Sequence, residues 1–116
     1  LPNCYSREDA VFNLQRATLL VAALATGTKD VFPDALFDRM HQPFRMNQSP
    51  GMKEILDLRA PGLLGCALSG AGPAMLVLYE TGREEVVDLV RGEFAKAGTK
   101  AEAMFPRIDR DGLVVE

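Results

Sequence analysis

The chain has few of the residue types that build metal centres and disulfide frameworks. Its 116 residues include two cysteines, one histidine and no tryptophan. Cys4 and Cys66 lie far apart, and neither belongs to a Cys-x-x-Cys or Cys/His ligand set, so neither a disulfide framework nor a zinc site has support. We expect two buried, reduced thiols.

Long apolar runs and charge of one dominant sign are also missing. The longest apolar stretch, residues 17–25, has about half the length that a bilayer crossing requires and is typical of a core helix. The formal net charge is −3, and the basic residues are scattered, which argues against nucleic-acid binding. No basic leader with an apolar segment opens the chain, so we expect a cytoplasmic protein without a membrane partner.

What the sequence does contain is typical of one globular domain. The apolar share is 47% and the charged share is 25%, both close to the averages of such domains. A length of 116 residues is enough to bury a sizeable core. The chain begins at Leu1 rather than at Met, and we expect it to be part of a longer polypeptide.

A long helix is predicted over about residues 8–25. Ser6 and Asp9 have the spacing of a capping box at its start, and Gly27 can adopt the left-handed conformation that ends a helix. Apolar side chains recur between these residues at helical spacing. The positions are Val11, Leu14, Thr18, Val21 and Ala25.

Prolines mark shorter helices in the next stretch. We predict a second helix that opens at Pro33 and is closed by Pro43. A third helix is predicted to start at Ser49 and Pro50, because a polar cap followed by proline is typical of a helix start. It should end at Pro61 and Gly62.

The second half of the chain has a different pattern. Short apolar runs bracketed by glycines predict buried strands at residues 63–69 and 74–80, followed by a helix over residues 84–97. Polar and apolar residues mostly alternate over residues 100–105, which predicts a further strand. The dipeptide at residues 111–112 is typical of a hairpin turn and leads into a terminal strand.

Together these elements predict an α+β fold. It is close to a ferredoxin-like split βαβ sandwich, with an antiparallel sheet, helices on one face and extra helices at the N-terminal side. The first strand of that motif is missing from the sequence, and we expect it upstream of Leu1.

The loop between the two predicted strands has the sequence SGAGP, residues 69–73. It is not a Walker A loop, because Pro73 and Ala74 stand where Lys and Ser or Thr would follow the glycine. It is not a dinucleotide-binding loop either, because it opens a strand and not a helix. It is either a plain hairpin turn or a turn whose exposed N–H groups press against a neighbouring loop or ligand. Those N–H groups belong to Gly70, Ala71 and Gly72.

In this setting SGAGP resembles the third conserved motif of the GHMP kinase family. Residues 9–27 (DAVFNLQRATLLVAALATG), 40–45 (MHQPFR) and 61–73 (PGLLGCALSGAGP) are all similar to the homoserine kinase branch of that family. The resemblance covers essentially the whole chain. One departure is Ala74, because the family usually places Ser or Thr there, so any hydroxyl contact from that position is absent or unneeded.

The resemblance implies that residues 1–116 are a GHMP kinase C-terminal domain. The implied reaction is ATP-dependent phosphorylation of the side-chain hydroxyl of L-homoserine to O-phosphohomoserine, in threonine biosynthesis. ATP and Mg²⁺ would be bound mainly by an N-terminal domain absent from this chain, so we expect no catalytic residue and no metal ligand here. The isolated chain is expected to be inactive.

The resemblance also assigns a substrate residue. A guanidinium matches a carboxylate with paired donors, and in homoserine kinases an Arg in this segment binds the substrate carboxylate, which implies that role for Arg45. The alternative is that Arg45 is a solvated side chain on a loop and has no role in substrate binding. The glycine loop of Ser69, Gly70, Ala71, Gly72 and Pro73 would support the nucleotide loop of the missing domain.

Further candidates for the substrate pocket are Asn13, Arg16 and His41. Asp9, Asn13 and Arg16 form one polar stripe on an otherwise apolar helix, and such a stripe is usually a solvated face or an internal salt bridge. In the family, however, the Asn and Arg recur, which implies a role toward the domain junction or the active site. For His41 we favour capping of the last carbonyls of the second helix over a general base.

Two other functions stay open from the sequence. One is a non-catalytic, ferredoxin-like module that binds a small molecule for regulation. The other is a different GHMP kinase, such as the diphosphocytidyl-methylerythritol kinase, which carries a similar glycine loop. A homodimer is also left open.

Overall fold

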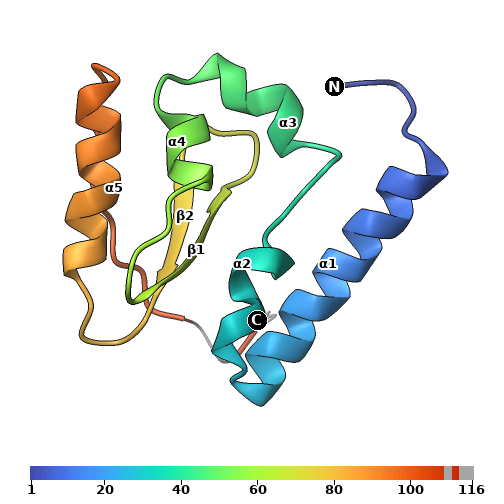
Figure 1. The fold of residues 1–116 in the computed structure, drawn as a ribbon, viewed down its shortest axis with the longest axis horizontal. Helices are drawn as coiled ribbons and strands as arrows, with labels where there is room; N and C mark the ends of the chain where they lie inside the picture. Colours follow the sequence, from blue (N-terminus) through green and yellow to red (C-terminus); the bar gives the residue numbers. More distant parts are fainter. Residues whose placement is uncertain (109–110, 113–116) are drawn as a thin grey trace, which may run out of the picture.

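A computed structural model of the chain describes residues 1–108 and 111–112 (Figure 1). The predicted strand after the turn at residues 111–112 lies outside the described residues. Figure 1 shows α1 along one side of the molecule and α5 along the opposite side, with α4 and the hairpin of β1 and β2 between them. The elements in chain order are α1 (Arg7–Thr26), the 3-10 turn η1 (Lys29–Val31), α2 (Phe32–Ala35), α3 (Gln42–Arg45), the 3-10 turn η2 (Met46–Gln48), α4 (Met52–Leu56), β1 (Leu63–Leu68), β2 (Met75–Tyr79) and α5 (Glu85–Lys96).

Helix α1 has the boundaries that its capping residues predict. The Ser6 hydroxyl oxygen accepts a hydrogen bond from the Asp9 N–H at 3.0 Å and donates to the Asp9 carboxylate at 2.6 Å. Gly27 ends the helix with φ 70°, a conformation in which a residue with a Cβ is disfavoured.

The predictions for the short helices are wrong in their boundaries. The second helix ends at Ala35 and does not continue to Pro43, which instead lies in the first turn of α3. Proline is well tolerated there, because the first N–H groups of a helix have no partner within it. The third helix begins only at Met52 and ends at Leu56, well before Pro61.

The sheet is an antiparallel pair, in which β1 runs against β2 with Leu68 opposite Met75 and an irregularity between Leu63 and Gly65. The α+β class and the helix α5 are confirmed. The strand predicted at residues 100–105 is wrong, because that segment has no strand pairing. Alternation places Ala101 against the core, yet a strand also needs a backbone partner, and the described sheet has two strands.

Strand β1 lies close to α2 because Gly65 has no side chain. A Cβ at this position would lie 2.6 Å from Cδ1 of Leu36, and the φ of Gly65 is 156°. A residue with a Cβ here would adopt a strained backbone conformation and would displace the end of the Leu36 side chain, so a glycine suits this close packing of β1 against α2.

The core lies between the hairpin, α4 and α5. A cluster of buried side chains, Ile55, Cys66, Val90 and Phe94, draws on α4, β1 and α5. The expectation of two buried thiols is half wrong, since Cys66 is buried but Cys4 is exposed. Apolar burial of this kind is the main source of folding free energy.

Helix α1 was predicted to be a core helix and is covered on one side only. Its one buried residue is Ala23. The apolar positions predicted from spacing point outward, with Leu14 68% exposed and Val21 67% exposed. The helix packs against α2 through its other side.

Candidate functional site

The segment between α2 and α3 is organised by the carboxylate of Asp38. It accepts hydrogen bonds from the N–H groups of Met40 at 2.9 Å, of His41 at 2.8 Å and of Gln42, and from Nδ2 of Asn13 at 2.5 Å. Burial alone would raise the pKa of Asp38, but these hydrogen bonds favour the charged form and together hold the pKa below its ordinary value of 3.8. Asp38 is therefore a carboxylate at neutral pH that fixes the start of α3.

The polar stripe on α1 faces this segment and not the solvent. Oδ1 of Asn13 accepts a hydrogen bond from the N–H of Arg39 at 2.9 Å. Nη1 of Arg16 donates to the carbonyl of Asp34 at 3.4 Å, and its guanidinium lies 4.9 Å from the centre of the Phe12 ring. Asn13 thus attaches α1 to the segment that leads into α3, and Arg16 attaches it to α2.

His41 occupies a different place from the one predicted. It stands at the N-cap of α3 with φ −129°, and its side chain makes no capping hydrogen bond. The capping role at the end of the second helix is wrong, because that helix ends at Ala35. The backbone of His41 is held by Asp38, so its position next to Gln42 is fixed while its imidazole is free of a capping contact.

Gln42 joins the two sequence motifs. Its side chain is buried, donates through Nε2 to the carbonyl of Leu36 at 3.0 Å, and accepts at Oε1 from the N–H of Leu68 at 2.9 Å. Leu68 immediately precedes the glycine loop that begins at Ser69. One buried amide therefore fixes the MHQPFR segment to the start of the loop, and buried polar groups with both partners present resist displacement.

The glycine loop closes as a tight turn. The N–H of Ser69 donates to the carbonyl of Ala74 at 2.9 Å, and the N–H of Gly72 donates to the carbonyl of Ser69 at 3.2 Å. The expectation that Gly72 presents a free N–H is therefore wrong. The N–H groups of Gly70 and Ala71 make no hydrogen bond within residues 1–108 and 111–112, and both residues are exposed.

The loop lies beside the start of α4. Gly72 has φ 83°, and a Cβ there would lie 3.0 Å from Leu68 Cδ1 and 3.8 Å from Met52 Cε. In Figure 1 the loop between β1 and β2, α3 and α4 gather at one end of the molecule, in agreement with the Gln42 hydrogen bonds. At Gly72 the missing side chain thus allows close packing within this chain, whereas in the described part of the chain Gly70 has no neighbour within 4 Å of a Cβ position.

Arg45 ends α3 with unused donors. Its Nη1 donates to Oε1 of Gln48 at 3.2 Å. Its Nε is buried and has no hydrogen-bond partner in the described part of the chain, and the same is true of Nε of Arg16. A buried N–H without a partner is unfavourable, so both guanidiniums have capacity to bind an oxyanion such as a carboxylate. Asn13 and His41 meet at Asp38, and Arg45 follows His41 by one helical turn.

A cavity of about 200 Å³ lies between α2, α3, α4 and β1, and it contains none of the predicted site residues. One of its lining groups is the thiol of Cys66, whose pKa burial raises to about 11 despite the opposing effect of Arg59. A thiol in this state is protonated at neutral pH and is a poor nucleophile. Cys66 therefore does not supply a nucleophile to this cavity.

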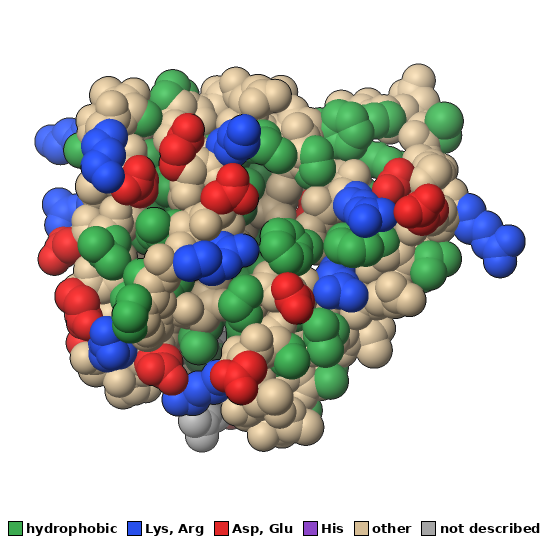
Figure 2. All heavy atoms as spheres, in the orientation of Figure 1, with side chains coloured by type: hydrophobic (Ala, Val, Ile, Leu, Met, Phe, Trp, Pro, Cys, Tyr) green, Lys and Arg blue, Asp and Glu red, His purple; other side chains and the backbone are tan. Residues whose placement is uncertain are grey.

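The described residues contain no group of three His, Cys, Asp or Glu side chains that could hold a metal ion. Among the same residues, no helix has the length and apolar character needed to cross a membrane. Figure 2 shows acidic and basic side chains interspersed over the face of the molecule that it presents. Over the residues that the structure describes, that face therefore has no large patch of a single charge sign.

Sequence reasoning missed Asp38 and Gln42. The available signal was Pro43, which is favoured in the first turn of a helix and so marks a start near residue 42. Given that start, Asp38 lies where an acidic side chain can cap free N–H groups. The partners of Gln42 are 6 and 26 residues away and leave no local pattern.

The fold and the site define a small α+β domain that presents a glycine turn and an arginine-bearing helix at one end. Residues 20–97 match the family described as "GHMP kinases C terminal", and the chain belongs to this family.

Its relatives include proteins named homoserine kinase. The homoserine kinase of Solibacter usitatus (strain Ellin6076) is 60% identical over 113 residues, which cover 97% of this chain and 37% of the relative. The homoserine kinase of Saccharomyces cerevisiae (strain ATCC 204508 / S288c) is 41% identical over 122 residues, covering 100% of this chain and 34% of the relative. The chain therefore spans only about a third of the length of the curated relatives it matches.

A solved structure has the same fold. The crystal structure of homoserine kinase from Cytophaga hutchinsonii ATCC 33406 superimposes with a TM-score of 0.70 and 24% sequence identity. The match covers 84% of this chain and 31% of that chain.

Proposed function

We propose that this chain is the C-terminal domain of a homoserine kinase. The complete protein would transfer the γ-phosphoryl group of ATP to the side-chain hydroxyl of L-homoserine and form O-phosphohomoserine, on the route to threonine in the cytoplasm. The observation that carries the proposal is the 60% identity, over 97% of this chain, with a relative named homoserine kinase. A second observation that supports it is the pair of hydrogen bonds through which Gln42 joins the MHQPFR segment to the start of the glycine loop.

Arg45 is proposed to bind the carboxylate of homoserine. Its Nε has no partner in the described structure, and its Nη1 donates a hydrogen bond to the neutral side chain of Gln48. A carboxylate would satisfy such donors in a bidentate, charge-assisted geometry. Asn13, Arg16 and His41 are proposed to complete this wall of the pocket, because Asp38 holds two of them in place.

The glycine loop is proposed to support the nucleotide loop of an N-terminal domain. Its free N–H groups at Gly70 and Ala71 fit an anionic or carbonyl neighbour. ATP and Mg²⁺ would be held mainly by that domain. Phosphoryl transfer depends on positioning and on neutralising phosphate charge, so the chain alone is expected to be inactive.

Steady-state kinetics of the full-length enzyme test this proposal. Arg45→Ala should raise the KM for homoserine by about 10- to 100-fold and leave the KM for ATP nearly unchanged, the expected loss for a charge-assisted pair. Arg91→Ala is the matched control, because Arg91 lies on the exposed surface of α5 in a pair with Asp88. An unchanged homoserine KM would remove Arg45 from the pocket.

A substrate panel tests the reaction itself. A coupled assay with homoserine and other small hydroxy compounds should show the highest kcat/KM for homoserine. Turnover confined to another alcohol would assign the domain to a different kinase of the family, and no turnover of any alcohol would contradict the kinase proposal.

A further inference from the structure

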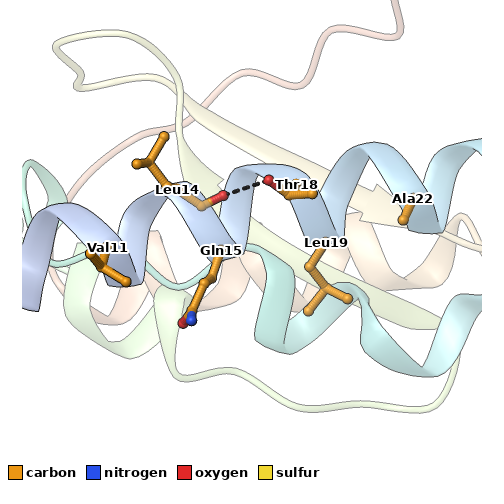
Figure 3. Close-up of a pocket in the computed structure, with 6 residues that line it drawn as sticks. All are labelled: Val11, Leu14, Gln15, Thr18, Leu19 and Ala22. Carbon is orange, nitrogen blue, oxygen red and sulfur yellow. Dashed lines mark hydrogen bonds between the residues drawn. The ribbon is translucent and has the colours of Figure 1, made fainter.

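The outward face of α1 is apolar and uncovered. Large side chains on it are 44% to 68% exposed, and Figure 3 shows two of them, Val11 and Leu14, on neighbouring turns of the helix. The exposed large apolar residues of α1 are Val11, Leu14, Val21 and Leu24.

The opposite face of α1 already has its partners. Ala23 is buried, and Asn13 and Arg16 contact the segment before α3. Arg16 is also the single charged residue between positions 11 and 25, so the outward face has no charge over this length. A helix that is apolar on both faces is typically covered on both faces, whereas a surface helix has a polar outer side.

This face has few hydrogen-bonding groups that a partner would have to satisfy. A shallow hollow of about 470 Å³ is lined by Val11, Leu14, Gln15, Thr18, Leu19 and Ala22. Its hydroxyl is already satisfied, since Oγ1 of Thr18 donates to the carbonyl of Leu14 at 2.8 Å (Figure 3). A complementary surface needs apolar side chains and one or two groups for Gln15.

We propose that this outward face of α1 docks against the N-terminal part of the same polypeptide. Residues 20–97 match the C-terminal model of the family, and the chain covers 37% of its relative from Solibacter usitatus, so most of such a protein lies outside the aligned region. α1 is the first helix of the chain and starts at Arg7, so a preceding domain would be tethered a few residues from this face.

Two partners could cover this face, the preceding domain or a second copy of the protein, and the covalent linker favours the preceding domain. A short linker gives a neighbouring domain an effective concentration in the millimolar range, above the concentration at which a second copy competes in dilute solution. The docked occupant is therefore the preceding domain and not a second copy. This inference rests on the position of the chain within its family and not on the reaction.

Thiol labelling of the full-length protein tests the proposal. In a Cys4→Ser background, Leu14→Cys is compared with Leu89→Cys, a control on α5 that is similarly apolar and 46% exposed in wild type. The labelling rate with a maleimide is followed by mass spectrometry of each peptide, at a concentration where sedimentation shows a monomer. Kinase activity or circular dichroism confirms folding, and Val21→Cys replaces Leu14→Cys if that variant misfolds.

The position-14 thiol should react about 10-fold or more slowly than the position-89 thiol, because a contact closed most of the time gives that protection. The two rates should become equal in urea. Equal rates in the native monomer would overturn the proposal. Protection that appears only when the protein dimerises would also overturn it, because the second copy would then be the occupant.

Discussion

The hairpin layer, made of β1, β2, α4 and α5, and the long helix α1 bury apolar surface in different ways. The layer closes around its own cluster, in which Ile55 is fully buried. Helix α1 has one buried residue, Ala23, and is attached by polar contacts from Asn13 and Arg16. The layer is therefore stabilised from within this chain, whereas α1 depends on hydrogen bonds and on whatever covers its outer face.

This difference means that the hairpin layer contributes mainly to folding, whereas the outward face of α1 contributes mainly to assembly with a partner. Loss of an apolar group in the layer should cost stability in any context. Loss of an apolar group on the outward face of α1 should matter only when a partner is docked there.

The largest effect is expected for Ile55→Ala. Ile55 is 0% exposed, and truncating a fully buried isoleucine costs about 3 kcal/mol through lost transfer free energy and the cavity left behind. Denaturant unfolding of the chain, followed by circular dichroism, should show a lower midpoint with an unchanged slope. A loss below about 1 kcal/mol would mean that this core is loosely packed.

A smaller loss, about 2 kcal/mol, is expected for Asp38→Asn. The amide removes a charged acceptor from several N–H groups, and hydrogen bonds to charged groups contribute more than neutral ones. Because the pKa of Asp38 is lowered, its stabilisation is present above pH 3.8 and is lost as the pH falls through the native value. Wild type and variant should thus converge in acid.

Hydrogen exchange shows where that loss falls. In the Asp38→Asn variant, amides of α1 should exchange faster while those of α5 stay protected. An equal increase in the amide exchange rates of both helices would show that α1 and the layer unfold as one unit. The two regions would then not differ in how they are stabilised.

Alkaline pH should weaken the layer through Cys66. Burial raises its pKa from 9.0 to about 11, so the folded state keeps a proton that the unfolded state releases between these values. Stability is then complete below pH 9 and should fall by about 1–2 kcal/mol as the pH rises to 11. Unfolding of Cys66→Ala over the same range isolates this contribution, because the variant keeps every other titrating group.

The smallest effect is expected for Leu14→Ala in this chain. Leu14 is 68% exposed, and surface substitutions usually change the free energy of unfolding by about 0.5 kcal/mol or less. The same substitution in the full-length protein should cost more, because it truncates a docked side chain. Equal small effects in both proteins would argue that the face stays uncovered.

Elements with strong local signals were predictable from the sequence. Capping by Ser6 and Gly27 gave α1 within a residue or two, and glycine-bracketed apolar runs gave β1 and β2. Residues 100–105 alternate like a strand, but alternation describes one face and does not supply a backbone partner. The short helices were misplaced because Pro43 was interpreted as an end, whereas proline is equally compatible with a helix start.

The candidate site was predictable only in part. The resemblance singled out Arg45 and the glycine loop, and the structure places their segments at one end of the molecule. The residues that set this geometry, Asp38 and Gln42, act through contacts distant in sequence. Burial of α1 was overestimated because spacing shows that a face is apolar without showing which chain covers it.

The amide of Gln42 has a practical consequence for solution work. The N–H of Leu68 can only donate and the carbonyl of Leu36 can only accept, so one orientation of the amide satisfies both. Its side-chain NH₂ resonance should stand apart from those of solvated glutamines. Under titration with homoserine or nucleotide, that single signal would report whether two stretches 26 residues apart keep their register.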